Sequence, residues 1–144
     1  MITRTEHDLL GDMDIPAQAW YGIQTQRALD NFDITGVPIS HFPELIQALA
    51  MVKSAAASAN LEVGVLPAHK AEAIIAACDD IVAGRLHDQF VVDLIQGGAG
   101  TSTNMNANEV IANLALEKLG HGKGEYRHLH PNDDVNRSQS TNDA

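Results

Sequence analysis

Two stretches of the chain gather small polar side chains at spacings that suit the binding of an anion. In the first, QGGAGTSTNMN over residues 96–106, a glycine-rich turn runs into Thr101, Ser102, Thr103 and Asn104. Glycine lets the backbone approach a ligand closely, and a helix that starts after it presents unpaired N–H groups. The stretch could therefore hold a carboxylate or phosphate with neutral donors. The alternative is a plain glycine turn whose helix is capped by Thr101 or Ser102.

The glycine turn does not match the two common nucleotide-binding motifs. A P-loop requires a lysine directly after its last glycine, where this chain has Thr101. The dinucleotide fingerprint requires a further glycine at a spacing that the chain lacks. The stretch therefore gives no indication of a nucleotide site.

The second stretch is HPNDDVNRSQSTND over residues 130–143, which ends in two hydroxyls and a carboxamide: Ser140, Thr141 and Asn142. These donors suit a carboxylate or an amino group. The alternative is a capped turn, because serine, threonine and asparagine are common turn and cap residues. Neither stretch has an adjacent cation or strong base, so a catalytic site built from the two alone would be incomplete.

Other polar residues are predicted to have structural roles. Three histidines lack the spacing of a zinc site: His121, His128 and His130. Glu109 and the pair Asp79 and Asp80 are predicted to be surface charges on helices. Four asparagines in one helical stretch allow two interpretations, a solvated face or a polar face that lines a pocket or a subunit contact: Asn104, Asn106, Asn108 and Asn113.

Composition limits the classes of function. The chain has 144 residues, of which 44% are hydrophobic and 4% aromatic, so it can bury a core of aliphatic helices. Its formal net charge of −10 argues against nucleic-acid binding. Cys78 is the single cysteine and lies in an apolar helical stretch, which indicates a buried, inert thiol and a reducing compartment. There is no secretory signal and no membrane-length apolar run, so we expect a cytoplasmic protein.

Apolar periodicity predicts three long helices, over residues 43–62, 67–83 and 101–119. Proline at the start and glycine after the end delimit the first two. The predicted apolar stripe of the first helix is Leu45, Leu49, Val52, Ala56 and Ala59. In the second helix the predicted face is Ala71, Ile74, Ile75, Cys78, Ile81 and Val82.

The flanking segments are shorter or irregular. Residues 3–16 are predicted to form a strand or hairpin, residues 19–32 a short helix and residues 35–40 a loop. The stretch after residue 120 is polar and irregular, and it stops inside an organised motif. We therefore expect the chain to be a piece of a longer protein.

Three segments resemble the aspartase/fumarase superfamily, and within it the aspartase branch. They are RTEHDLLGDMDIPAQAWYGIQTQRALDNF, QGGAGTSTNMNANEVIANLALE and HPNDDVNRSQSTND. Ala99, Ser102 and Thr141 have the aspartase forms, because class II fumarases usually read G-S-G-T-Q-S-N-M-N and Q-S-S-N-D in the last two motifs. The resemblance implies a mainly α fold, the N-terminal helical domain of the superfamily, with a small β element near the N-terminus.

The resemblance also implies reversible deamination of L-aspartate to fumarate and ammonia. Thr101, Ser140 and Thr141 would contact the β-carboxylate, and Asn142 would contact the amino group. A second anion-binding region would consist of His130, Asn132 and Asp133. No organic cofactor and no metal ligand in this chain are implied, although some members are activated by a divalent metal such as Mg.

Much of the family's machinery is expected downstream of this chain. The resemblance implies domain 1 over residues 1–139 and the start of a central helical bundle over 140–144. The catalytic serine base, a substrate-binding lysine and the bundle that builds a homotetramer would follow. The resemblance therefore implies no catalytic residue in this chain, and we expect the 144-residue chain alone to be inactive.

Two other functions remain open from the sequence. The chain could belong to a class II fumarase or a related lyase of the superfamily. It could instead be a helical module that binds a protein partner through apolar faces. No nucleic-acid or membrane partner is expected in any of these cases.

Overall fold

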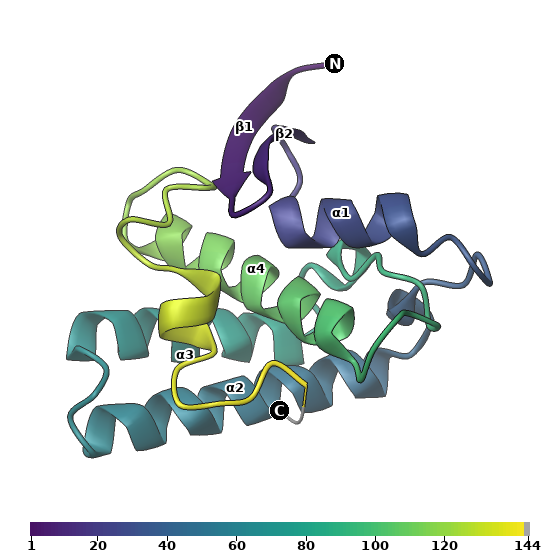
Figure 1. Ribbon diagram of the computed structural model, residues 1–144. Coiled ribbons are helices and arrows are strands. Elements are labelled where there is room, and N and C mark those ends of the chain that lie inside the picture. Colours follow the sequence, from purple (N-terminus) through teal and green to yellow (C-terminus); the bar gives the residue numbers. More distant parts are fainter. Residues whose placement is uncertain (143–144) are drawn as a thin grey trace.

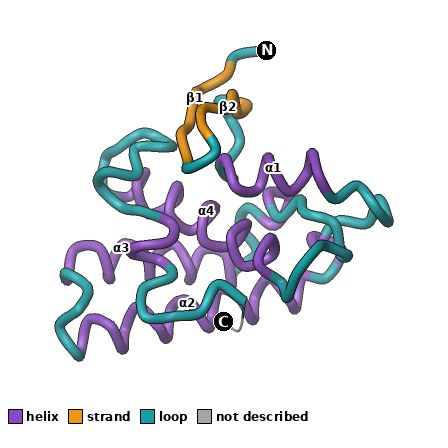
Figure 2. Tube along the Cα trace, in the orientation of Figure 1, coloured by secondary structure: helices purple, strands orange, loops and turns teal. Residues whose placement is uncertain are grey.

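A computed structural model describes residues 1–142 as a helical domain with one small hairpin (Figures 1 and 2). The predicted fold class, mainly α with a small β element near the N-terminus, is confirmed. The elements are β1 Thr3–Asp8, β2 Gly11–Pro16, α1 Ile23–Asn31, α2 Pro43–Glu62, α3 Ala68–Val82 and α4 Thr101–Lys118. A π-helical turn, Pro131–Val135, interrupts the polar segment that was expected to be irregular. Among the described residues, no helix combines the length and apolarity needed to cross a membrane.

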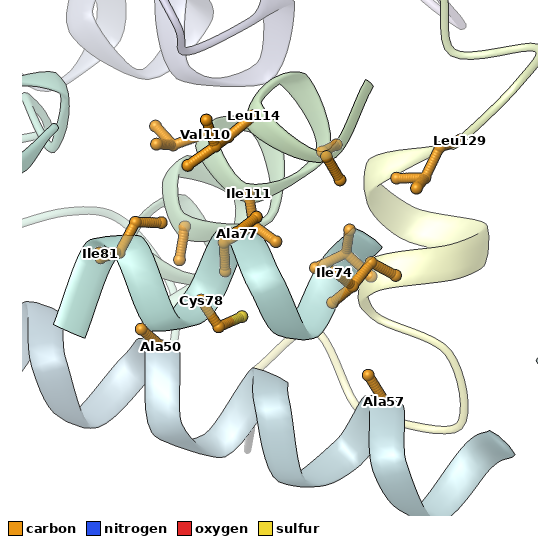
Figure 3. Packing of buried hydrophobic residues seen from close by; sticks show 14 of the residues in the cluster. Ala50, Ala57, Ile74, Ala77, Cys78, Ile81, Val110, Ile111, Leu114 and Leu129 are labelled. Carbon is orange, nitrogen blue, oxygen red and sulfur yellow. The ribbon is translucent and has the colours of Figure 1, made fainter. Parts of the chain in front are cut away.

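Helix α4 lies at the centre of the molecule. Helices α2 and α3 pack against each other on one side of it, and α1 and the hairpin cover the other (Figure 1). Figure 3 shows α3 between its two neighbours, with Ala77 and Ile81 near α4 and Cys78 near α2. The many alanines in these contacts let the helices approach closely, which compensates for the scarcity of aromatic residues.

The predicted apolar stripe of α2 is wrong, although the bounds of the helix are correct. Leu45 is 40% exposed and Val52 is 48% exposed. The buried stripe lies one position further along: Ile46, Ala50, Lys53, Ala57 and Asn60. Two of its members are polar because they bond the chain segment that crosses α2, so apolar periodicity could not identify this face.

The predictions for α3 hold better. Ala71, Ile74, Cys78 and Ile81 are buried, while Ile75 and Val82 are half-buried at the edge of the core. The Cys78 thiol is buried as predicted, and burial raises its pKa to about 12. The thiol is therefore inert at neutral pH.

An ion pair between Arg27 of α1 and Asp8 of β1 connects the hairpin to α1. Strands β1 and β2 pair antiparallel from Thr3 opposite Pro16 to Asp8 opposite Gly11. The Arg27 guanidinium of α1 donates to both carboxylate oxygens of Asp8, each at 2.8 Å, and to the carbonyl of Gly11 at 3.1 Å. These bonds hold the hairpin tip beside the start of α4, where the candidate site lies.

Candidate functional site

A cavity of about 650 Å³ lies between the hairpin and α1 on one side and α4 and the C-terminal segment on the other. Four of the residues predicted for the site line it: Thr101, His130, Asn132 and Thr141. The opposite wall is built mainly by the hairpin tip and α1: His7, Asp8, Leu9, Leu10, Ile23 and Gln24. The fold thus brings the two polar stretches of the sequence to one place.

Three of the four predicted substrate-binding residues form a chain of contacts across two segments, and the fourth, Thr141, lines the cavity. The Thr101 hydroxyl donates a hydrogen bond to the side-chain oxygen of Asn142. The backbone N–H of Asn142 donates to the Ser140 hydroxyl at 3.1 Å. Asn142 itself lines a neighbouring cavity of about 500 Å³ beside the glycine turn. The first cavity thus receives a hydroxyl from each motif, Thr101 and Thr141, while Asn142 lies at its neighbour.

The glycine turn is closed by a residue that the sequence pattern did not single out. The side-chain oxygen of Gln96 accepts hydrogen bonds from the backbone N–H of Ser102 at 2.6 Å and of Thr103 at 3.2 Å. Gly100 is the N-cap residue of α4, with a left-handed φ of 94°, and neither Thr101 nor Ser102 caps the helix. Because Gln96 occupies the N–H groups of Ser102 and Thr103, side chains would supply most of the donors of an anion site here.

The asparagines of α4 are buried, so the solvated face considered for them is wrong. Asn106 accepts from the backbone N–H of Val91 at 2.9 Å, and Asn113 donates to the carbonyl of Trp20 at 2.7 Å. Asn104 and Asn108 both donate to the side-chain oxygen of Asn136, at 3.0 and 3.2 Å. The polar face of α4 thus binds three segments that are distant in sequence, at Trp20, Val91 and Asn136.

A buried lysine supports the second polar stretch. Lys53 of α2 is fully buried, and its ammonium donates to Asn136 at 2.8 Å and to Gln139 at 3.0 Å. Burial lowers its pKa to about 8. No cation near this stretch was predicted because Lys53 is distant from it in sequence. The one sequence feature that could have indicated a buried lysine is its position in an alanine-rich helix.

The second predicted anion region is divided between two cavities. His130 and Asn132 line the first, whereas His130 and Asp133 line another of about 650 Å³ together with Lys70. The ring Nδ1 of His130 accepts from the backbone N–H of Asn132 at 3.1 Å and of Asp133 at 3.2 Å. These N–H groups are already paired, so the side chains would have to contact an anion.

The other two histidines of the polar segment do not join His130. His121 and His128 stack on each other, with ring centroids 3.8 Å apart. Within residues 1–142, no group of three or more His, Cys, Asp or Glu side chains has an arrangement that could hold a metal ion.

Glu109 was predicted to be a surface charge, and this prediction is wrong. Its side chain is 1% exposed and lines the first cavity. It faces α1, where it accepts a hydrogen bond from the backbone N–H of Thr25 at 3.1 Å. The prediction failed because the partner of Glu109 is a helix end far away in the sequence. Asp79 is exposed as predicted, and Asp80 is only half-buried in a surface ion pair with Arg85.

Comparison with known proteins identifies the family to which this fold and cavity belong. A family model described as Lyase matches residues 11–144. The chain therefore belongs to this lyase family, and the resemblance to the aspartase/fumarase superfamily is confirmed.

Among individual proteins, the chain is similar in sequence to aspartate ammonia-lyases. The chain is 65% identical over 142 residues to the aspartate ammonia-lyase of Pseudomonas aeruginosa, and 56% identical over 142 residues to that of Escherichia coli. These alignments cover 99% and 98% of this chain. The chain spans about 30% of the length of these curated relatives.

Two solved structures of lyases have the same fold as this chain. A fumarate lyase:delta crystallin from Brucella melitensis has a TM-score of 0.95 and 61% sequence identity, over 97% of this chain and 33% of that one. A class II fumarase from Schistosoma mansoni has a TM-score of 0.87 and 35% identity, over 97% of this chain and 29% of that one. The fold is thus shared with a class II fumarase, while sequence identity is higher to the aspartate ammonia-lyases, at 65% and 56%, than to that fumarase, at 35%.

Proposed function

We propose that this chain is domain 1 of a homotetrameric lyase that reversibly converts L-aspartate to fumarate and ammonia. The observation that carries the proposal is the convergence of the two polar stretches, in which Thr101 contacts Asn142 and shares a cavity with Thr141. The names of the similar proteins support aspartate as the substrate. The aspartase forms of Ala99, Ser102 and Thr141 favour it over malate.

The chemistry of the site fits the stabilisation of a developing charge. When a base removes a proton from Cβ of aspartate, the β-carboxylate becomes a doubly charged aci-carboxylate before ammonia leaves. Hydroxyl donors from Thr101, Ser140 and Thr141 would strengthen their hydrogen bonds as that charge grows. Asn142 would then release Thr101 and turn its carboxamide oxygen to the amino group of the substrate. The base and the balancing cation would come from parts of the complete protein beyond residue 144.

The roles of His130, Asn132 and Asp133 follow as a second proposal. Their side chains would bind an anion at the entrance, before it reaches the cavity that His130 and Asn132 share with Thr101 and Thr141. We propose that no organic cofactor is required. A divalent metal such as Mg would act as an activator, and no side chain of this domain would coordinate it.

The test is formation of fumarate from L-aspartate by the complete gene product and by two variants at position 101. Thr101→Val removes the hydroxyl and keeps the shape of the side chain. A lost hydrogen bond to a charged group costs about 1.5–3 kcal/mol, so kcat/KM should fall by about 10-fold to 100-fold. Thr101→Ser keeps a hydroxyl and should retain most of the activity. Equal kcat/KM values in all three proteins would overturn the role of Thr101.

A further inference from the structure

Two buried carboxyl groups converge on the N-terminus of α1. Glu6 of β1 is 5% exposed and accepts a hydrogen bond from the backbone N–H of Ile23 at 2.8 Å. Glu109 of α4 is 1% exposed and accepts from the N–H of Thr25 at 3.1 Å. One negative charge is favourable at a helix N-terminus. Two ionised carboxylates buried side by side repel each other and lose their hydration.

Gly22 shows how closely these groups approach. A Cβ atom added there would lie 2.7 Å from Oε2 of Glu6, and closer still to Oε2 of Glu109 and the hydroxyl of Tyr126. Three side-chain oxygens thus face one point of the backbone. Oε2 of Glu109 is buried and has no hydrogen-bond partner among the described residues. An ionised oxygen in this position would be unfavourable, whereas a protonated carboxyl group can donate a hydrogen bond toward its neighbours.

The surrounding charges indicate which of the two carboxyl groups carries the proton. The Arg4 guanidinium donates to Oε1 of Glu6 at 2.9 Å, and the Tyr126 hydroxyl donates to the same oxygen at 3.3 Å. Glu6 is therefore paired as a carboxylate, and Arg4 is fully engaged by Glu6 and backbone carbonyls. The ring of His130 lies edge-on to that of Tyr126, with centroids 5.8 Å apart.

The pKa values agree with this assignment. Burial, followed by the charge of Glu6, raises the pKa of Glu109 well above its usual range, and the backbone N–H groups of Thr25, Gly22 and Gln24 offset only part of that rise. Burial and both carboxyl groups also raise the pKa of Tyr126 well above its usual range, so the phenol remains a donor. Glu109 thus has no cation of its own with which to ionise.

We propose that Glu109 is held as a neutral acid and acts as a positioning residue that keeps α1 and the hairpin against α4. Leu10 and Ile23 build one wall of the cavity, and Thr101 and Met105 of α4 build the other. The contact between Glu109 and Thr25 joins the two walls. Ionisation of Glu109 would therefore loosen the hairpin and widen the cavity. The inference concerns packing within the chain, and only its effect on turnover rests on the proposed function.

The direction of the pH dependence follows from proton linkage. The pKa of Glu109 is raised in the folded state, so its stabilising effect is complete below the pKa of an unfolded glutamate. The effect is lost as the pH rises toward the folded-state pKa. Over that window one proton separates the closed and open states, and the opening equilibrium can change by up to about tenfold per pH unit.

The test is hydrogen–deuterium exchange by mass spectrometry on the complete gene product from about pH 5 to about pH 9, corrected for the intrinsic pH dependence of exchange. Peptides within residues 1–31 report on the hairpin and α1. In the parent protein their protection should fall by about tenfold or more as the pH rises. Glu109→Gln keeps the acceptor for Thr25 and adds a permanent donor, so its protection should stay constant.

Two further variants test whether the pH dependence of protection belongs to Glu109. Glu117→Gln removes an exposed carboxylate from the same helix and should behave like the parent protein. Glu6→Gln removes the charge that opposes ionisation of Glu109, so the loss of protection should shrink. Parallel loss of protection in the parent and Glu109→Gln proteins, or no loss in either, would overturn the inference. Exchange needs no substrate, so an inactive protein with the expected pattern would contradict the proposed function and not this inference.

Discussion

At the scale of single residues, the described wall of the cavity relies on neutral donors. The hydroxyl of Thr101 is already bonded to Asn142, so a ligand must exchange one hydrogen bond for another. Such an exchange contributes little to the binding of a ground-state carboxylate. It contributes more when the charge on that carboxylate doubles, because hydrogen bonds to a stronger acceptor are stronger. Neutral donors therefore suit a lyase whose transition state is more negative than its substrate.

Lys53 provides a prediction on stability. Its pKa is lowered to about 8 by burial, below the value of about 10.4 for a free lysine. From about pH 8 the unfolded state binds more protons at Lys53 than the folded state does, so the contribution of Lys53 to the free energy of unfolding should rise with pH. Cys78, whose pKa is raised to about 12, contributes with the opposite sign above about pH 9, so the net rise is expected between about pH 8 and about pH 9. Lys53→Met removes the titrating group and should abolish this rise.

The measurement is urea unfolding of the complete gene product at several pH values in this window. Lys70→Met is the matched control, because Lys70 pairs with Asp134 at 2.8 Å at the protein surface and is not fully buried. The control should keep the rise with pH. If the Lys53→Met protein shows the same rise as the parent, the assignment of the buried titration to Lys53 is wrong.

At the scale of elements, the bounds of the long helices could be predicted, and the orientation of α2 and the capping of α4 could not. Pro43 at the start and Gly64 beyond the end delimit α2 by local chemistry, which a sequence carries. The buried face of α2 depends on Lys53 and Asn60, whose partners lie in a distant segment. Tertiary pairing of polar groups leaves no periodic signal, so the predicted stripe lies one residue too early.

The candidate site could also be predicted only in part from the sequence. The polar motifs at Thr101 and Ser140–Asn142 could be identified from residue types and from a family resemblance. Their meeting at one cavity required the fold. The buried Glu109 could not be predicted, because its burial depends on Glu6 and on the N-terminus of α1, which are remote in sequence.

The cap of α4 gives a prediction at this scale. Gln96→Ala leaves the N–H groups of Ser102 and Thr103 without their acceptor, and should lower the free energy of unfolding by about 1 kcal/mol. Gln96→Glu keeps an acceptor and places a negative charge at a helix N-terminus, so stability should be unchanged or higher. Chemical denaturation of the three proteins measures the difference. Equal destabilisation by both substitutions would contradict the capping role.

At the scale of the whole molecule, the proposed reaction needs a cation that the described lining of the cavity does not contain. Among residues 1–142, the polar part of the cavity lining consists of hydroxyls, carboxamides, imidazoles and two acidic side chains, with no lysine or arginine. A dicarboxylate needs a cation to balance its charge, and the chain carries a formal net charge of −10. The proposed function therefore requires a cation from outside the described lining, and the curated relatives are about three times as long as this chain.

The purified 144-residue chain is therefore expected to produce no fumarate from L-aspartate above the uncatalysed rate. Circular dichroism should show a mainly helical spectrum, which separates lack of activity from lack of folding. The measurement is the absorbance of fumarate with the chain in excess. Sustained turnover by the isolated chain would contradict this expectation, because a base and a cation site would then have to lie within the chain.

The central claim is that the cavity around Thr101 and Thr141 belongs to a lyase for aspartate and not for malate. The most direct measurement is the rate of fumarate formation by the complete gene product, with L-aspartate and with L-malate in separate assays. Turnover of L-aspartate without turnover of L-malate is the predicted result. Turnover of L-malate alone would contradict the claim, and would show that Ala99, Ser102 and Thr141 do not determine the substrate.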